Sequence, residues 1–461
     1  MDLYGRLLHD VLFPGWERLR GRPTTELIGY LERTQWAELD ELEALQSGFL
    51  RRLLRHAYRH TAFYRERFDA AGIAPDDIRG PDDLVRVPLL ERPDARDRAA
   101  DREATAPPAV AVRKATSGTT GMPMIIAYNA ESRHWRDATR WRGYGWGGYR
   151  TGMRAFHFWG FGAVPPASRL GRMKIELDHK LRRDRYVDCT PRGDDYLAGV
   201  VTQLRAYRPD VLVTYSRAGA ALAQYVIQHG ARDWDTIPVV CGAERLWPHE
   251  RELIERAFGP AVFETYGCRE FMLLASECDA HDGLHTSMEN LIVELVVREP
   301  DGTTRAARPG EVGEVVITDL HNLAAPFIRY VNGDLAVARA PERCACGRWL
   351  TRIGPIEGRV TETLCDATGN AVSGLIFNIM VVSLAEHTRE FQVVQHVDRS
   401  ITLRVVPMTP GRMAPIVYKL THDFVGKYLA GVPIRIEMVD DIPPTRAGKR
   451  QVVVVEKAAA A

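Results

Sequence analysis

Short apolar runs that alternate with helical patterns constrain the fold of this chain more than any other feature of its sequence. Beyond about residue 111, such runs occur at residues 211–213, 239–240, 292–297 and 315–317. Strands that alternate with helices are typical of an α/β protein with mixed β-sheets. Before that region leucines recur near helical spacing, so residues 1–75 are predicted to form a helical lead-in.

The alternation of strands and helices starts again after about residue 360. The chain has 461 residues, which is more than one ordinary domain of ~100–200 residues holds. The final part combines a few apolar runs with one helical stretch near residues 413–430. We therefore predict a large N-terminal α/β domain over residues 1–360 and a small C-terminal α+β domain over residues 361–461.

The charges of the chain balance almost completely. Lys and Arg number 61 against 60 Asp and Glu, which gives a net charge of +1. This balance gives no electrostatic reason to expect a nucleic acid or an anionic membrane as a partner. No apolar run approaches the ~18 residues that span a bilayer, and the first residues lack the pattern of a secretory signal. We therefore expect a cytoplasmic protein.

Residues 116–123 form the densest run of glycine and hydroxyl residues in the chain. Those with phosphate-binding potential are Ser117, Gly118, Thr119, Thr120 and Gly121. Glycines let backbone N–H groups approach an anion closely, and hydroxyl groups add further donors. The run is not a Walker A loop, because no Lys follows the second glycine. It predicts a phosphate-binding loop; the alternative is an ordinary Ser/Thr/Gly turn.

This run resembles the phosphate-binding loop of the adenylate-forming superfamily, especially its phenylacetate-CoA ligase-like branch, which includes the CapK-like proteins. Further segments resemble motifs of that family, in the family's order, from about residue 30 to 455. They are residues 242–244, 264–270, 329–334 and 358–359, and the Arg-x-Gly-Lys loop that ends at Lys449. The resemblance implies an adenylating N-terminal domain and a mobile C-terminal lid domain.

The resembling motifs imply roles for particular residues that bind the nucleotide. Gly242, Ala243 and Glu244 would pack against adenine, as would Tyr266 beside Gly267. Glu270 would bind Mg²⁺, for which a hard carboxylate is a suitable ligand. Asp334 would hold both ribose hydroxyls, because a carboxylate accepts two O–H donors. Arg359 would reach the ribose or a phosphate, at the start of a hinge at residues 359–363.

The resemblance also implies a set of cations around the phosphates. Lys449 would be the mobile cation that stabilises the charge developing during adenylation. The branch usually has Lys where this chain has Met122. That departure removes one phosphate contact of the family, and either Lys114 or Arg113 could replace it.

An aromatic stretch at residues 155–162, together with residues 213–216, borders the acyl pocket in the resembling family. The residues that would line this pocket are His157, Phe158, Phe161, Tyr215 and Ser216. A flat aromatic acid would stack well there, and His157 could contact a polar substituent or the carboxylate. Core packing is the alternative explanation for so many aromatic side chains.

Two of the seven cysteines, Cys344 and Cys346, lie only two positions apart. Cys278 and His285 precede them, and three thiolates with one imidazole suit tetrahedral Zn²⁺. His281 competes with His285 as the histidine ligand. The resemblance supports a structural zinc, since some proteins of the branch carry one at matching positions. The alternative is four unlinked reduced residues in neighbouring loops.

The resemblance implies an enzyme that uses ATP and Mg²⁺ to convert a small, aromatic carboxylic acid into an acyl-adenylate, and then passes the acyl group to CoA. One alternative keeps the adenylation but uses an amine, a carrier protein or a non-carboxylate acceptor. Another is a non-catalytic nucleotide-binding protein of the same fold. The expected partners are the acid, ATP and CoA, and a homodimer is an open possibility.

Overall fold

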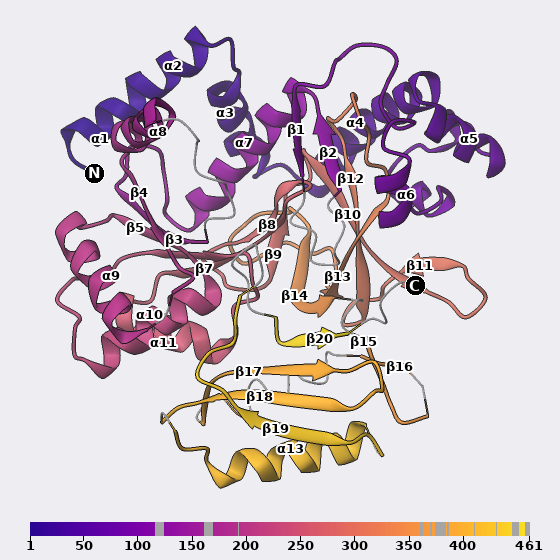
Figure 1. The fold of residues 1–461 in the computed structure, drawn as a ribbon. Coiled ribbons are helices and arrows are strands. Elements are labelled where there is room, and N and C mark those ends of the chain that lie inside the picture. The colour runs from indigo at the N-terminus through magenta and orange to yellow at the C-terminus, as the bar shows by residue number, and fades with distance from the viewer. Residues whose placement is uncertain are drawn as a thin grey trace. The chain divides into compact units, whose positions relative to one another are not determined.

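A computed structural model describes residues 1–115, 124–160, 169–191, 193–359, 363–368, 371–373, 384, 387–409, 411–429, 431–444 and 451–456. The chain divides into two compact units (Figure 1). Unit 1 comprises residues 1–332 and 336–355, and unit 2 comprises residues 333–335 and 356–461. None of the helices in the described part of the chain is both long and apolar enough to cross a bilayer.

A twelve-stranded sheet runs through the large unit in the order β11-β10-β12-β13-β14-β9-β8-β7-β6-β5-β3-β4. The strands from β4 to β7 pair in parallel, whereas β7, β8 and β9 pair antiparallel. The mixed sheet confirms the predicted α/β fold class. Its strands are β3 (Ala155–Trp159), β4 (Asp184–Asp188), β5 (Val211–Tyr215), β6 (Val239–Gly242), β7 (Val262–Cys268), β8 (Met272–Glu277), β9 (Leu284–Thr286), β10 (Leu291–Arg298), β11 (Thr304–Ala306), β12 (Val312–Asp319), β13 (Tyr330–Ala338) and β14 (Arg352–Arg359).

Three helices, α9 (Asp194–Tyr207), α10 (Ser216–Gln228) and α11 (Pro248–Phe258), cover one face of the parallel strands. The apolar residues of α9 recur at helical spacing, for example at Leu197, Val201 and Leu204, and all three are buried against this face. Burying one such side chain stabilises the fold by about 1.5–3 kcal/mol. This buried cluster therefore packs against the strands whose ends carry several of the predicted site residues.

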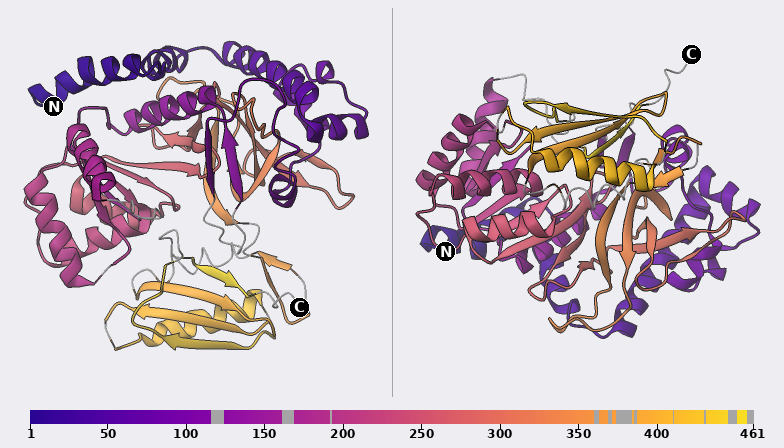
Figure 2. Two further views of the ribbon diagram at one scale, coloured as in Figure 1. Left: turned by 45° about the horizontal axis from the view of Figure 1, so that its top comes forward. Right: turned by 90° about the horizontal axis from the view of Figure 1, so that it is seen from below.

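The N-terminal helices run along one side of unit 1 (Figure 2). They are α1 (Leu3–Leu7), η1 (Leu8–Leu12), α2 (Phe13–Leu19), α3 (Thr24–Thr34), α4 (Leu39–His60) and α5 (Ala62–Ala70). Leu31 of α3 is fully buried beside Trp135 of the long helix α7 (Ala130–Trp146). This packing fixes α7 against the antiparallel part of the sheet, where it contacts β8.

Unit 1 also contains several shorter elements. A two-stranded antiparallel sheet, β1 (Val112–Ala115) and β2 (Ile125–Tyr128), flanks residues 116–123. The other elements are η2 (Pro75–Asp77), η3 (Pro81–Arg86), α6 (Arg92–Asp97) and α8 (Arg169–Arg182).

Unit 2 contains a four-stranded sheet in the order β19-β18-β17-β20 and a helix that packs on it. Val393, Leu403 and Val405 of the sheet share a buried cluster with Val417 of the helix. Its elements are β15 (Thr363–Cys365), β16 (Ala371–Ser373), β17 (Thr388–Gln395), β18 (Ile401–Pro407), α13 (Pro415–Tyr428), β19 (Ile434–Met438) and β20 (Val453–Val455).

Candidate functional site

The turn from β7 to β8 carries the Tyr-Gly-x-x-Glu motif, at the point where the sheet changes from parallel to antiparallel pairing. The ladder between the two strands is irregular at Tyr266 and Gly267. A Cβ atom on Gly267 would lie 2.2 Å from the carbonyl oxygen of Met272. Only glycine therefore fits this position without moving the β8 backbone. The tight turn aligns Tyr266 and Glu270 on either side of the bend.

Glu270 is buried, with 5% of its surface exposed. Its Oε1 lies 3.2 Å from Nη1 of Arg92 and accepts a hydrogen bond of 3.3 Å from the hydroxyl of Tyr330. Burial, together with the charge of Glu270, raises the pKa of Tyr330 well above its usual range, so the phenol remains a donor. Within the described part of the chain, Oε2 of Glu270 makes no hydrogen bond. One carboxylate oxygen thus remains for a ligand.

Arg136 of α7 contacts the backbone of Glu270. It donates a hydrogen bond to the Glu270 carbonyl oxygen, and its Nη2 lies 2.6 Å from Oδ2 of Asp319. The two charged side chains of this pair are each 1% exposed. The guanidinium carbon of Arg136 also lies 4.2 Å from the ring centre of Tyr128. Glu270 therefore rests on a buried ion pair that joins α7 to β12.

Tyr266 is also buried, and its hydroxyl accepts a hydrogen bond of 2.7 Å from Nδ2 of Asn332 on β13. Asp334 follows on the same strand and is 7% exposed. Gly333 between them has φ +84°, which favours glycine over other residues. Tyr266 and Asn332 are thus brought together, although they lie 66 residues apart.

The residues predicted to pack against adenine follow the end of β6. Ala243 adopts a left-handed backbone with φ +66°, a conformation that strains a residue with a side chain. Ser216, the first residue of α10, donates a hydrogen bond of 2.8 Å to the carbonyl oxygen of Glu244. The structure therefore joins a predicted pocket residue to the predicted adenine loop. Gly242 is buried at the end of β6.

Behind this loop, Glu264 of β7 accepts a hydrogen bond of 2.9 Å from the backbone N–H of Leu246. Burial raises the pKa of Glu264 to about 7, and the nearby carboxylate of Glu277 adds to the increase. Glu277 itself is bound in a bidentate manner by Arg251, at 2.9 and 2.7 Å.

The aromatic residues predicted to line the acyl pocket divide between two environments. His157 lies 3.1 Å from Asp184 and stacks on Tyr186 at 4.2 Å between ring centres. Phe158, the next residue of β3, is fully buried in the core cluster that also contains Tyr215. Because successive strand residues point to opposite faces, His157 and Phe158 do not share one wall.

Several predicted site residues lie outside the described part of the chain. They are Ser117, Gly118, Thr119, Thr120, Gly121, Phe161 and Lys449, together with Met122. The backbone of Arg359 is described as the last residue of β14. The roles inferred for these residues remain predictions.

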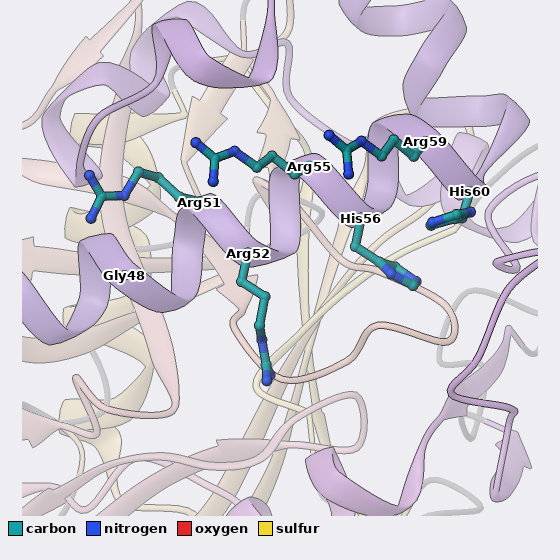
Figure 3. A pocket seen from close by; sticks show the side chains of 7 residues that line it. All are labelled: Gly48, Arg51, Arg52, Arg55, His56, Arg59 and His60. Atoms are coloured by element: carbon teal, nitrogen blue, oxygen red, sulfur yellow. The ribbon is translucent and has the colours of Figure 1, made fainter.

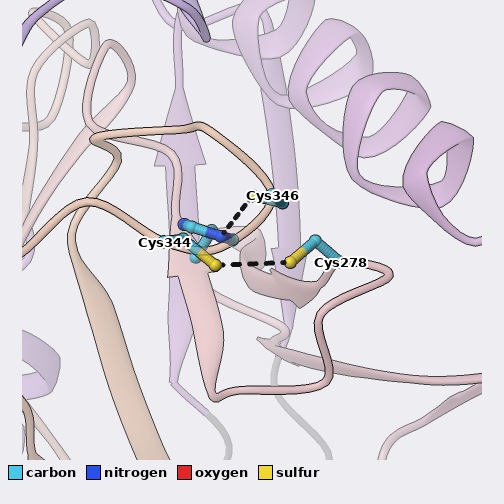
Figure 4. Close-up of side chains that lie close together, drawn as sticks. Cys278, Cys344 and Cys346 are labelled. Carbon is cyan, nitrogen blue, oxygen red and sulfur yellow. Dashed lines mark hydrogen bonds between the residues drawn. The ribbon is translucent and has the colours of Figure 1, made fainter.

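A second candidate site contains Cys278, His285, Cys344 and Cys346 (Figure 4). Their ligand atoms all lie within 4.8 Å of one another. The Sγ atoms of Cys278 and Cys344 are 3.8 Å apart, and Sγ of Cys346 is 3.4 Å from Nε2 of His285. Three sulfurs and one imidazole nitrogen at these separations fit a tetrahedral ion such as Zn²⁺.

The surroundings of this cluster orient its histidine. Nδ1 of His285 lies 2.8 Å from the carbonyl oxygen of Leu350, so the ring can direct Nε2 towards the sulfurs. Burial lowers the pKa of His285 to about 4, which keeps the imidazole neutral, as a metal ligand must be. His281, the competing histidine, lies 3.1 Å from Glu277 instead.

Sequence analysis missed Arg92, Arg136 and Asp319. These residues come from three distant elements, and no local motif marks them. Tyr330, in contrast, lies within the Arg-Tyr-x-x-Gly-Asp motif, which is the sequence signal for its position beside Glu270.

Comparisons with known proteins place the chain among characterised ligases, although no protein-family model matches it. The chain is 31% identical over 356 residues to the phenylacetate-coenzyme A ligase of Escherichia coli K12, which amounts to 72% of this chain and 75% of that enzyme. The phenylacetate-coenzyme A ligase of Thermus thermophilus is 29% identical over 336 residues, or 70% of this chain and 72% of the relative.

Solved structures with a similar fold include a 2-hydroxyisobutyryl-CoA ligase bound to an acyl-adenylate. That structure has a TM-score of 0.70 at 18% identity and covers 92% of both chains. An open conformation of the same ligase, in complex with 2-HIB-AMP and CoA, has a TM-score of 0.58 and covers 93% of this chain and 94% of the other. At this identity the likeness is one of fold.

Proposed function

This chain belongs to the phenylacetate-coenzyme A ligase family of adenylate-forming enzymes, and we propose that it joins a small, aromatic carboxylic acid to CoA through an acyl-adenylate. The likeness to the curated ligases supports the reaction. The observation that carries the site assignment is the turn from β7 to β8, which holds Tyr266 and Glu270 against two residues of β13.

In the first half-reaction, a carboxylate oxygen of the acid attacks the α-phosphorus of ATP, and the bond to the pyrophosphate leaving group breaks. Tyr266 and residues 242–244 would bind the base, and Asp334 would bind the ribose. Glu270 has a carboxylate oxygen free for Mg²⁺, which would neutralise phosphate charge when bound. Arg92 and Tyr330 would hold that carboxylate in one orientation.

In the second half-reaction, the CoA thiolate attacks the acyl carbonyl carbon and AMP leaves. We propose that residues 361–461 move as a lid between the two steps, and that residues 359–363 are the hinge. Lys449→Ala should then abolish most adenylation, because one preorganised charge is worth about 3–4 kcal/mol to a developing anion. Thiolysis of supplied acyl-AMP should persist. Equal loss of both steps would contradict the proposal.

The decisive experiment is ATP–pyrophosphate exchange against a panel of aryl acids, followed by product analysis with and without CoA. Acid-dependent exchange and an acyl-CoA product are expected. Exchange without an acyl-CoA product would favour an amine or a carrier protein as acceptor. Nucleotide binding without exchange would favour a non-catalytic protein. Asp334→Ala should weaken ATP and AMP binding alike, because both ligands carry the same ribose.

We further propose that Cys278, His285, Cys344 and Cys346 hold a structural Zn²⁺, because their donor atoms suit that ion and the site offers no open position for chemistry. The purified protein should contain about one zinc per chain. Cys344→Ser with Cys346→Ser should remove the metal and lower thermal stability more than the activity of each folded molecule. Cys365→Ser, outside the cluster, is the matched control and should retain the metal. Zinc-free protein prepared without chelator would refute the assignment.

A further inference from the structure

The surroundings of Glu270 hold more cationic groups than carboxylates. Arg92 pairs with Glu270, and Arg136 pairs with Asp319. Lys114 and Arg269 lie in the same region, and neither makes an ion pair with any residue that the structure describes. Among the described residues, these two cations therefore have no carboxylate partner of their own.

Lys114 is half-buried on β1, which runs antiparallel to β2 (Figure 1). Its Nζ lies 5.2 Å from the ring centre of Tyr128, the ring that Arg136 also faces. Burial, together with the positive charges of Arg136 and Arg269, lowers the pKa of Lys114 to about 8, whereas Cys268 and Glu270 act in the opposite sense. A nearby anionic ligand would stabilise the charged form of this amine and offset the cost of its burial.

Arg269, which belongs to the Tyr-Gly-x-x-Glu motif, contacts the last residue of β1. Its Nε donates a hydrogen bond of 2.9 Å to the carbonyl oxygen of Ala115, the residue after Lys114. The guanidinium is exposed, so its remaining N–H groups are available to a ligand. The bond places both cations at the start of residues 116–123.

Arg113, the neighbour of Lys114, is already paired with a carboxylate. It makes a two-pronged ion pair with Glu103, in which Nη2 lies 2.7 Å from Oε2. Because strand residues alternate, Arg113 and Lys114 point to opposite faces of β1. Of the two basic residues before the loop, only Lys114 is therefore free to bind an anion.

We propose that Lys114 and Arg269 bind the phosphate groups of ATP beyond the α-phosphate. This inference rests on the proposed function and names two residues of this chain for a contact that Met122 cannot make. A polyphosphate carries several negative charges and would compensate both cations at once. Pyrophosphate, the product of the first half-reaction, carries the same groups and would occupy the same contact.

The test compares ATP, pyrophosphate and AMP binding by calorimetry in the unaltered protein and in Lys114→Met, Arg269→Gln and Arg113→Gln. Each of the first two substitutions should weaken ATP and pyrophosphate binding about tenfold or more, because each removes a charge-assisted contact. AMP binding should not change, since AMP lacks the distal phosphates. Arg113→Gln is the matched control and should bind all three ligands normally.

A second measurement uses proton uptake and needs only conservative changes. At pH 8 about half of Lys114 is uncharged, so ATP binding by the unaltered protein should take up ~half a proton. Calorimetry in two buffers of different ionisation enthalpy measures that uptake. Lys114→Arg should bind ATP with less uptake, because arginine is already charged.

Unchanged ATP affinity in Lys114→Met, or an equal loss of ATP and AMP affinity, would overturn the inference. An equal loss would mean that Lys114 only supports the fold. If Lys114→Met does not fold, the Arg269→Gln and Lys114→Arg measurements decide the question. Failure of the proposed function is visible separately, as absence of acid-dependent pyrophosphate exchange in the unaltered protein.

Discussion

Two arginine-rich regions of unit 1 contain the same kind of ion pair in opposite environments. The α4 groove, defined by Gly48, Arg51, Arg52, Arg55, His56, Arg59 and His60, encloses about 620 Å³ (Figure 3). There Arg52 lies 2.7 Å from Glu131, and the two side chains are 43% and 39% exposed. On α7, Arg142 lies 2.7 Å from Glu289, and both side chains are 1% exposed.

The equal distances show that geometry alone does not determine what an ion pair contributes. Exposed pairs contribute about 0.2–1 kcal/mol, because water and salt screen their charges. Removing one partner of a buried pair costs about 3–5 kcal/mol, because an unpaired charge remains in the interior. The pairs on α7 are therefore expected to contribute far more to stability than the exposed charges of the α4 groove.

The largest effect is expected from Arg142→Met, which leaves Glu289 buried without its guanidinium. Unit 1 should lose about 3–5 kcal/mol of stability, measured by urea unfolding. The double variant with Glu289→Leu should recover part of the loss, because it removes the stranded charge. A loss below about 1 kcal/mol in the single variant would mean that the buried pair contributes no more stability than the exposed pairs of the α4 groove.

An intermediate effect is expected from Glu264, which is half-buried and accepts a hydrogen bond from a backbone N–H instead of a guanidinium. Its pKa in the folded protein is about 7, above the ordinary value of 4.5. The stability that this group contributes is therefore complete below about pH 4.5 and is lost as the pH rises through 7.

Thermal unfolding measured from pH 4.5 to 8 should show this decline, with a total of about 1–3 kcal/mol. Glu264→Gln should flatten the profile, because glutamine does not ionise. A profile that keeps its slope in the variant would assign the titration to another group.

The smallest effect is expected in the α4 groove. Arg51, Arg55 and Arg59 are spaced four residues apart, and Figure 3 shows their side chains on one side of the helix. Like charges at this spacing repel by about 0.2–0.5 kcal/mol. Arg51→Gln should therefore raise stability slightly at low salt, and the gain should vanish at high salt. Adenylation should not change. A large loss would mean that this arginine has a partner of its own.

The sequence predicted the fold class correctly, because the alternation of apolar runs and helical patterns is a local signal. It also indicated the Cys and His cluster, since two cysteines two positions apart mark a turn suited to a metal. The pair Arg136–Asp319 had no such signal. Nothing local distinguishes one buried arginine from the other basic residues of a chain with 61 of them, because burial is decided by distant segments.

The predicted acyl pocket is the part of the candidate site on which the sequence is least informative. A run of aromatic residues looks alike whether it lines a cavity or fills a core. Phe158 lies in the core, while His157 binds Asp184. The two-residue period of a strand places His157 and Phe158 on opposite faces of β3. It does not indicate which of these faces a ligand contacts.

The position of β7 has a consequence for how this chain can change during evolution. The strand pairs in parallel with β6 on one side and antiparallel with β8 on the other. An insertion or deletion within Val262–Cys268 would shift two ladders at once, each in a different pairing mode. Relatives should therefore differ in length in the connecting loops, and the spacing of this heptapeptide should be the last to drift.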